Sequence, residues 1–217
     1  MKYSAKDDYQ SDETARTYES REMYSGFLGR RRKKIEQSVI AQLIASMQTD
    51  SVILDCPCGN GRWFEALGAK ASRIIARDIS QGQTNMAMER ASALSVPHDI
   101  AISSADKLDL DDKSVDHVFC YALMKHLPVP LQYNILKEFS RVSRGPIYCS
   151  FAVLGHITYA RWRHTRQKQS FPVIAEEIEF MAEQSDLKLV ELKRVSQPII
   201  GLEYFAVFEP VDDMEAN

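Results

Sequence analysis

The segment ILDCPCGNGRW combines residue types that could bind a metal, a dinucleotide or another cofactor. An acid, two cysteines, a proline and two glycines directly follow an apolar run typical of a buried strand. Glycines at a turn from strand to helix let the backbone approach a ligand, and the helix N-terminus favours a polar or anionic group. The candidate binding residues of this segment are Asp55, Cys56, Pro57, Cys58, Gly59, Asn60 and Gly61.

The cysteines do not have the spacing of a metal site. Cys56 and Cys58 form a C-x-C pair with no second pair nearby, while Cys120 and Cys149 stand singly in other predicted strands. The spacings typical of zinc sites are absent, so we expect no metal. We favour the interpretation that the two cysteines are simply small residues at the point where a strand meets a loop.

The loop also departs from the dinucleotide fingerprint. That fingerprint requires a third glycine, where this chain has Phe64. Asp55 precedes Gly59 by four residues, and a carboxylate so close to a pyrophosphate would be unfavourable. The acid instead suits a cofactor that carries a positive group.

Composition indicates an ordinary globular chain with one large domain. The 217 residues are 45% hydrophobic and 26% charged, with a net charge of −3, so no strong field favours nucleic acid or an anionic membrane. No apolar run is long enough to span a membrane. A polar, acidic start (MKYSAKDDYQSDE) is unlike a secretory signal, and four cysteines cannot make a disulfide framework. We therefore expect a cytoplasmic protein, either a monomer or a homodimer.

The elements that must position this loop alternate between strand and helix. Apolar runs predict strands over 51–56, 71–78, 98–105, 113–123 and 145–153, and periodicity predicts helices over 30–48, 61–70, 83–94, 130–143 and 171–186. Two extended segments, 187–195 and 202–209, follow without a helix between them. The pattern predicts an α/β fold with a doubly wound, mostly parallel seven-stranded sheet and a C-terminal antiparallel hairpin.

Five segments together resemble the class I methyltransferases that depend on S-adenosylmethionine (SAM). ILDCPCGNGRW is similar to their first motif, D-x-G-x-G-x-G after strand one, with Pro57 in place of the first glycine. Asp78, seventeen residues after Gly61, stands where the family keeps an acid that accepts the ribose hydroxyls. SSADKLDLDDKSVDHVFC, ALMKHLP and LKEFSRVSRGPIYCSF resemble later segments, so the likeness covers about residues 35–150.

The resemblance implies a Rossmann-like fold and transfer of a methyl group from SAM to a small-molecule acceptor, at oxygen or nitrogen, leaving S-adenosylhomocysteine (SAH). In the adenine-binding stretch, Ser104 takes the place of the family's acid and Asp106 follows it. Beyond the first loop, the implied cofactor contacts are Asp78, Ile79, Ser104, Ala105, Asp106 and Cys120. The candidate bases or positioning groups are Tyr121, His126 and His156.

Two further segments have an expected role. Residues 1–30 are predicted to form an N-terminal arm that covers the cofactor, in which Tyr18 binds it and Arg21 pairs with its carboxylate. Residues 31–217 then form one domain. Within it, 152–175 is predicted to be a lid over the acceptor, and its cations and aromatic residues suit an acidic or phosphorylated acceptor. A solvated surface helix is the alternative for the lid.

Three other functions compete with small-molecule methylation. A non-catalytic SAM-binding or scaffold protein would share the cofactor motifs. A nucleic-acid methyltransferase is less favoured, because CYAL stands where amino-group methyltransferases carry an N-P-P-Y-type tetrapeptide, and the basic run RRRKK at 30–34 suits a solvated face. An oxidoreductase on a similar fold is the remaining alternative.

Overall fold

The computed structural model of the 217-residue chain describes residues 26–164, 170–195 and 202–211. Its elements, in order, are α3 (Gly26–Ser46), β1 (Ser51–Asp55), α4 (Phe64–Gly68), β2 (Ala71–Asp78), α5 (Gln81–Ala91), β3 (His98–Ile102), β4 (His117–Cys120), the 3₁₀ turn η2 (Met124–His126), α6 (Val129–Val142), β5 (Ile147–Ala152), α7 (His156–Arg163), α8 (Ala175–Glu183), β6 (Leu187–Arg194) and β7 (Glu203–Pro210).

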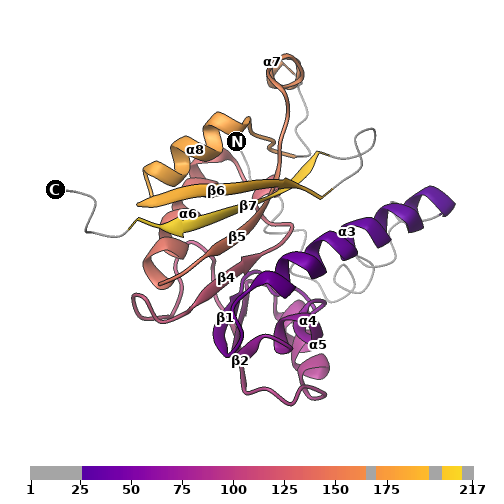
Figure 1. Cartoon of the computed structure of the whole chain (residues 1–217), viewed down its shortest axis with the longest axis vertical. Helices are drawn as coiled ribbons and strands as arrows, with labels where there is room; N and C mark the ends of the chain where they lie inside the picture. Colours follow the sequence, from indigo (N-terminus) through magenta and orange to yellow (C-terminus); the bar gives the residue numbers. More distant parts are fainter. Residues whose placement is uncertain (1–25, 165–169, 196–201, 212–217) are drawn as a thin grey trace.

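One seven-stranded sheet forms the centre, with the strand order β3-β2-β1-β4-β5-β7-β6 (Figure 1). The first five strands of the chain pair in parallel, and β7 pairs antiparallel with both β5 and β6. The order reverses between β1 and β4, because the chain runs outward to β3 and then returns to the other side of β1. Ligands of open α/β sheets bind at such a reversal, outside the carboxyl ends of the strands.

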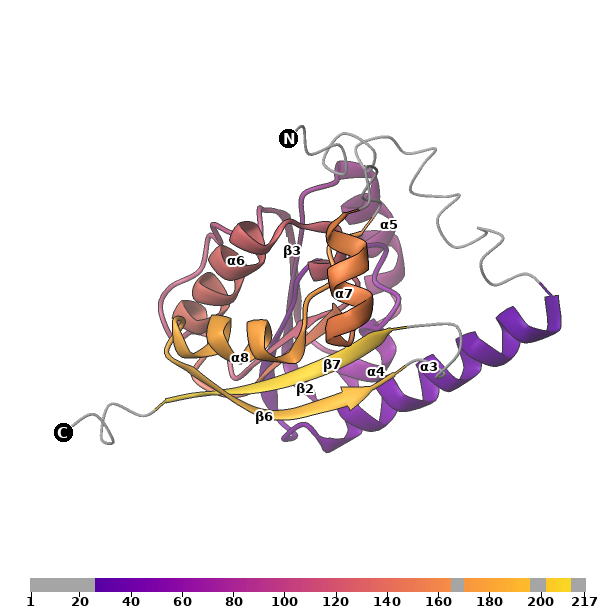
Figure 2. The same cartoon turned by 90° about the horizontal axis from the view of Figure 1, so that it is seen from above.

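Helices cover both faces of the sheet, as the alternation of buried residues requires (Figure 2). In β1, Ile53 packs toward α3, α4 and α5, while its neighbour Leu54 packs toward α6 and α8. Phe119 and Val118 divide in the same way in β4. Both faces of the central strands are therefore buried, which explains why their sequences read as continuous apolar runs.

The predicted fold class is confirmed, including the C-terminal hairpin. The two hairpin strands do not follow β5 in chain order within the sheet, however, since β7 lies between β5 and β6. In addition, residues 103–116, between β3 and β4, contain turns and isolated bridges rather than a helix. This connection lies over the sheet face on which α6 and α8 pack and forms part of the candidate site.

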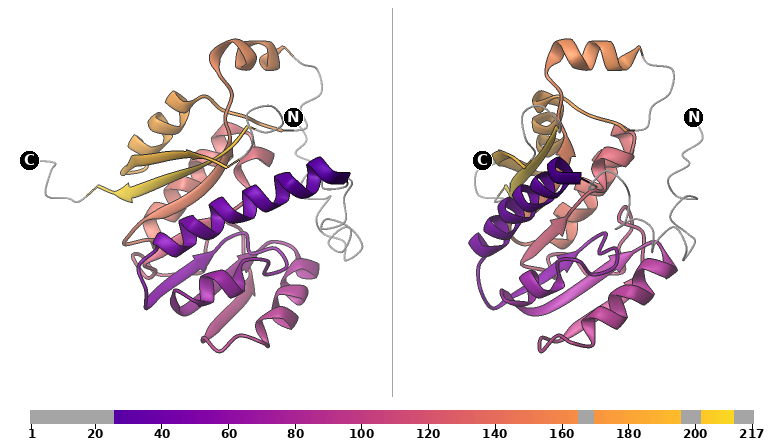
Figure 3. Two further views of the ribbon diagram at one scale, coloured as in Figure 1. Left: turned by 45° about the vertical axis from the view of Figure 1, so that its right-hand side comes forward. Right: turned by 90° about the vertical axis from the view of Figure 1, so that its right-hand side faces the viewer.

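Helix α7 stands away from the sheet (Figures 1 and 3). None of its residues is buried, and Ile157 is 74% exposed. Side-chain contacts join α7 to α8: His156 Nε2 lies 3.1 Å from Glu176 Oε1, and the Tyr159 hydroxyl donates to Glu177 Oε1 over 2.7 Å. This segment has no clear apolar period, because a helix without a buried face has no apolar stripe.

Across the described ranges, no helix is both long and apolar enough to cross a membrane.

Candidate functional site

The candidate site lies at the carboxyl edge of the sheet, where the order of the strands reverses. Asp55 ends β1, Asp78 ends β2 and Cys120 ends β4. The backbone N–H of Cys56 donates to Phe119 O over 3.0 Å, and that of Cys58 donates to Arg77 O over 2.9 Å. The loop after β1 is thus bonded to both neighbouring strands, which fixes its position at this edge.

The two positions of the loop that carry glycine do so for different structural reasons. Both have positive φ, +52° at Gly59 and +74° at Gly61, a region that side chains rarely adopt. A Cβ at Gly61 would lie 2.6 Å from ring atoms of Phe64, whereas a Cβ at Gly59 would meet Gln83 Oε1 only at 3.7 Å. Gly61 therefore makes room for the protein's own core, and Gly59 is the glycine that leaves the loop open.

Phe64 explains the missing third glycine. Its side chain is fully buried in the core beneath the loop, between α3, α4 and β1. The space next to Gly61 is thus filled by an aromatic ring of the same chain, at the position where a dinucleotide-binding protein has a glycine.

Asp78 connects the two loops of the site. Its Oδ2 accepts from the Gly59 N–H over 2.9 Å, and its Oδ1 accepts from the Ser80 N–H over 2.9 Å. Burial raises the pKa of the carboxyl group, while the N–H groups of Ser80, Gly59 and Ile79 act in the opposite direction. Because a carboxylate has about four acceptor positions, these bonds leave capacity for ligand hydroxyls.

Asp55 is the buried acid nearest to the loop backbone. It is 1% exposed, and its Oδ2 has no hydrogen-bond partner among the residues that the structure describes. Burial, and then the nearby charge of Asp78, raise the pKa of this carboxyl well above its usual range. A carboxylate oxygen buried without a donor is unfavourable unless a ligand supplies one. A cationic group placed there would satisfy Asp55 and lower its pKa again.

The cysteines of the site are buried thiols. Cys56, Cys58 and Cys120 are each less than a tenth exposed, and burial raises the pKa of all three. Their role as small residues at the strand ends fits this burial, because a raised pKa disfavours the reactive thiolate. In the part of the chain that the structure describes, no three His, Cys, Asp or Glu side chains gather in a way that could hold a metal ion.

Other predicted loop residues line the same edge. Pro57 is half-buried, and Asn60 is buried with its Oδ1 accepting from Arg90 Nη1 over 3.3 Å. Ile79 is half-buried immediately after Asp78. These contacts bring the first loop, the end of β2 and α5 together.

The predicted adenine-binding segment follows β3. Ser103 N donates to Asp78 O over 3.1 Å, so this segment begins beside the end of β2. The Ser104 hydroxyl donates to the exposed Asp106 carboxylate, and Ala105 packs against the core on the side of α6. Leu108 is 6% exposed and belongs to the same core.

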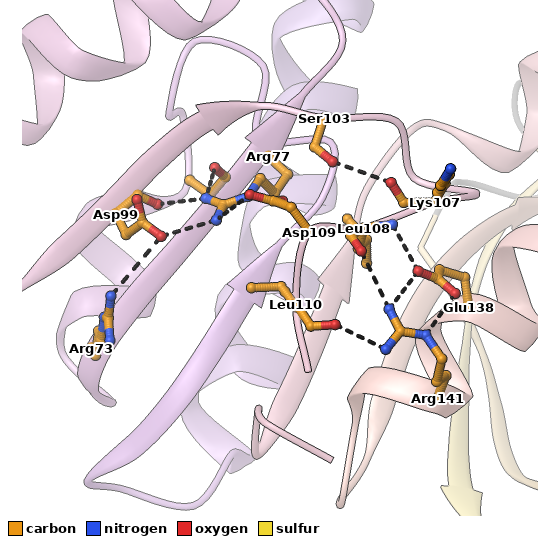
Figure 4. Close-up of polar contacts among 11 residues, drawn as sticks. Arg73, Arg77, Asp99, Ser103, Lys107, Leu108, Asp109, Leu110, Glu138 and Arg141 are labelled. Carbon is orange, nitrogen blue, oxygen red and sulfur yellow. Dashed lines mark hydrogen bonds and ion pairs between the residues drawn. The ribbon is translucent and has the colours of Figure 1, made fainter. Parts of the chain in front are cut away.

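The end of this segment is fixed by α6 (Figure 4). Glu138 Oε1 accepts from Leu108 N over 2.7 Å, and Arg141 Nη1 donates to Leu110 O over 2.8 Å. Arg141 also forms ion pairs with Glu138 and Asp112. These contacts give Arg141 a structural role, because they hold the connection between β3 and β4 against α6.

Tyr121 directly follows β4 and joins a cluster beside the first loop. Its hydroxyl donates to the carboxylate of Glu36, a residue of α3 that is 3% exposed. Arg62 Nη2 lies 3.7 Å from Glu36 Oε1, and the Arg62 guanidinium lies 5.8 Å from the Tyr121 ring centroid. Tyr121 also meets Trp63 edge to face at 5.8 Å. Tyr121 therefore contacts the two residues that follow Gly61.

The other candidate residues are His126, His156, Tyr18 and Arg21. His126 ends η2 and is half-buried. His156 begins α7 and is exposed. It pairs with Glu176, so this contact is with α8 and not with the loop after β1. Tyr18 and Arg21 of the predicted arm lie outside the described residues. α3 begins at Gly26, before the predicted end of the arm at residue 30.

Two important residues were missed by sequence reasoning. Glu36 lies four residues before Ile40 and seven before Leu43, on the buried stripe of its helix, so its position predicts a buried acid. Arg77 stands in the otherwise apolar strand segment IIARD and is 3% exposed. A charge within a buried run was the available signal in both cases.

Comparison with known proteins agrees with this geometry. Residues 53–145 match the family model described as a methyltransferase domain. Magnesium protoporphyrin IX methyltransferase of Synechocystis PCC 6803, solved with bound SAH, superposes with a TM-score of 0.73 at 13% identity, covering 94% of this chain and 97% of that chain. A 1,6-didemethyltoxoflavin-N1-methyltransferase of Burkholderia thailandensis superposes with a TM-score of 0.66 at 15% identity, covering 82% and 79%. A cyclase superposes with a TM-score of 0.65 at 15% identity, covering 79% and 80%.

Residues 53–145 therefore match a methyltransferase domain, and the chain has the fold of these solved methyltransferases, in agreement with the resemblance of its motifs. The residues present fit such a cofactor, because the partnerless Asp55 Oδ2 suits an ammonium group and the open side of Gly59 lets a ligand approach the backbone.

Proposed function

We propose that the protein binds SAM at the carboxyl edge of β1, β2 and β4 and catalyses transfer of its methyl group to a small-molecule acceptor, at oxygen or nitrogen. One observation carries the cofactor assignment: Asp55, 1% exposed, has a carboxylate oxygen without a hydrogen-bond partner. A phosphate group would be repelled there, whereas the ammonium of the methionine part of SAM would form a charge-assisted hydrogen bond.

The other predicted contacts follow from the order of the strands. Asp78, at the end of the neighbouring strand, has acceptor capacity for the two ribose hydroxyls. Ser104, Ala105 and Asp106, one strand farther out, are assigned to the adenine. The cofactor would thus extend across the edge from β1 toward β3, with its methionine part between β1 and β4.

When bound, SAM supplies a methyl group already activated by a sulfonium. The remaining task of the protein is to hold the acceptor atom in line behind that methyl and to exclude water, and alignment can supply on the order of 7–11 kcal/mol. We favour Tyr121 as the residue that positions the acceptor or takes its proton. Its contacts with Trp63 and Glu36 fix its ring beside the cofactor loop, and a base in such a position contributes about 10²–10⁴-fold.

Residues 152–175 are proposed to cover the acceptor. Support comes from α7, whose exposed Arg161 and Arg163 are carried on a helix that stands away from the sheet. Being two positions apart on a helix, these arginines point in different directions, so only one of them can face a given acidic or phosphorylated acceptor.

The test is incubation of the protein with SAM labelled in its methyl group and a fractionated extract of its own cells, followed by identification of the labelled product. A labelled small molecule whose formation requires intact Tyr121 supports the proposal. Since a cyclase shares the fold, the extract is also screened for unlabelled products. Such a product with no label transfer, or label in nucleic acid alone, would overturn the assignment.

A further inference from the structure

Arg77 is a buried cation with all its donors occupied (Figure 4). The guanidinium has five N–H groups, and five hydrogen bonds of 2.7–3.3 Å satisfy them. Nε and Nη2 donate to the Asp109 carboxylate, Nη1 donates to the carbonyls of Ala76 and Asp99, and Nη2 also donates to the Asp99 carboxylate. A charge with 3% exposure is tolerated in the fold because no donor is left without a partner.

These bonds differ in what they connect. Ala76 belongs to β2 and Asp99 to β3, and those two strands are already paired through their backbones. Asp109 belongs to the connection between β3 and β4, which has no backbone ladder with β2. The bonds from Arg77 to Asp109 are therefore the ones that add a constraint, because they tie this connection to the strand beneath it.

The constraint falls next to the predicted adenine-binding residues. Segment 104–107 begins after Ser103, whose N–H is bonded to Asp78 O, and ends before Leu108, whose N–H is bonded to Glu138. Within the segment, Lys107 N donates to Ser104 O over 3.0 Å. The segment is thus a short turn held at both ends, and Asp109 adds a second anchor to β2 beside the bond from Ser103 N to Asp78 O.

We propose that Arg77 and Asp109 are positioning residues, which hold segment 104–107 in its adenine-binding geometry and so set the preference of the site for adenine over other purines. This inference rests on the proposed function. Arg77 precedes Asp78, the residue assigned to the ribose, and adjacent strand residues point to opposite faces. One strand end therefore supports the ribose contact on one face and the adenine loop on the other.

The electrostatics of the pair favour a permanent contact. The Arg77 guanidinium holds the pKa of the Asp109 carboxyl below its usual range, so the ion pair persists at neutral pH. Asp109 is half-exposed, which allows it to be changed without opening the core.

The test compares Asp109→Asn with Asp99→Asn. Both substitutions weaken a charge-assisted bond to the same guanidinium, but only Asp109 lies in the loop. Calorimetry measures the binding of SAH and of S-inosylhomocysteine, in which an oxo group replaces the adenine amino group. Amide hydrogen exchange of residues 104–107 is measured in the free proteins.

We expect the wild type to prefer SAH, and Asp109→Asn to reduce that preference by a factor of about 3 to 10, the effect of roughly one hydrogen bond. Exchange at 104–107 should rise in the same variant. Asp99→Asn should retain the preference and the slow exchange, and Arg77→Lys should resemble Asp109→Asn because an ammonium lacks the fork.

Several outcomes would overturn the inference. These are a wild type that binds both probes equally, an Asp109→Asn protein with the wild-type preference, or an equal loss in both variants, which indicates general destabilisation. A wild type that binds neither probe contradicts the proposed function itself.

Discussion

The carboxylate of Asp78 holds the backbone of Gly59, with 2.9 Å between Asp78 Oδ2 and the Gly59 nitrogen across 19 positions of sequence. The same carboxylate accepts from Ser80 N at the start of α5. The glycine loop and the end of β2, which the motifs assign to different parts of the cofactor, are therefore one rigid unit.

Asp78→Ala should weaken SAH binding by about 1.5–3 kcal/mol, because a charged acceptor for two ribose hydroxyls is lost and the Gly59 N–H loses its partner. Isothermal calorimetry measures the affinity, and circular dichroism checks the fold. Asp111→Ala, at an exposed position of the β3–β4 connection, is the control. Wild-type affinity in a folded Asp78→Ala protein would remove Asp78 from the site.

Asp55→Asn should weaken SAH binding and leave binding of 5′-methylthioadenosine, which lacks the amino-acid part, nearly unchanged. The affinity of the wild type for SAH should also fall as the pH is lowered. The reason is that the pKa of the Asp55 carboxyl is raised, so protons compete with the ammonium at a higher pH than for an ordinary aspartate. Calorimetry from pH 5 to pH 8 tests both points. Equal losses for the two ligands would place Asp55 away from the ammonium.

Gly61→Ala should destabilise the protein more than Gly59→Ala. Both substitutions strain a left-handed backbone, which costs about 1–2 kcal/mol. Only the new methyl at position 61 overlaps the Phe64 ring, at 2.6 Å, and overpacking adds about 1–3 kcal/mol. Urea denaturation gives the free energies of unfolding. Gly155→Ala is the control, because its new Cβ would meet no described residue within 4 Å apart from its chain neighbours. Equal effects at 59 and 61 would show that Phe64 can move aside.

The stability of the protein should decrease as the pH falls below about 6.5, in part because of His117. This side chain is 4% exposed, and burial lowers its pKa from 6.5, against the opposing charge of Asp116. The unfolded chain therefore takes up the proton first, so the contribution of His117 is full above 6.5 and is lost as the pH falls toward the lowered pKa. One proton accounts for at most about 1.4 kcal/mol per pH unit.

The measurement for His117 is the free energy of unfolding at several values between pH 5 and pH 7.5. His117→Leu should reduce the slope, whereas His164→Leu, at an exposed position, should retain the wild-type slope. Parallel curves for all three proteins would contradict the assignment.

The sequence was informative where a residue's neighbours along the chain determine its environment. Apolar runs located the strands, and the motif around Asp55 and Gly59 located the loop, because a strand followed by a glycine turn is a local feature. The two consecutive final strands predicted the hairpin for the same reason. The order of these two strands in the sheet could not be predicted in this way. It depends on contacts with distant residues, since β7 lies between β5 and β6.

The parts that were missed depend on contacts between distant residues. Glu36 and Tyr121 are 85 positions apart, and Arg77 and Asp109 are 32 apart. No periodic pattern in the sequence predicts such a pair, although a charged residue in a buried stripe indicates that a partner exists. The interpretation of Gly61 as a glycine that lets a ligand approach was incomplete. The Phe64 ring leaves no room for a side chain at position 61, and only the packing of the structure reveals this. Helix α7 corresponds to the alternative of a solvated surface helix, which the sequence could not distinguish from a lid because a helix without buried residues has no apolar stripe.

The binding of SAH measured against the binding of NAD tests the central claim most directly, because it requires no knowledge of the acceptor. Titration calorimetry on the purified full-length protein uses SAH, SAM and NAD in turn. The account predicts that SAH and SAM bind at one site per chain and that NAD does not bind, since Asp55 disfavours a pyrophosphate and Phe64 occupies the place of the third glycine. Binding of NAD with no binding of SAH or SAM would contradict it.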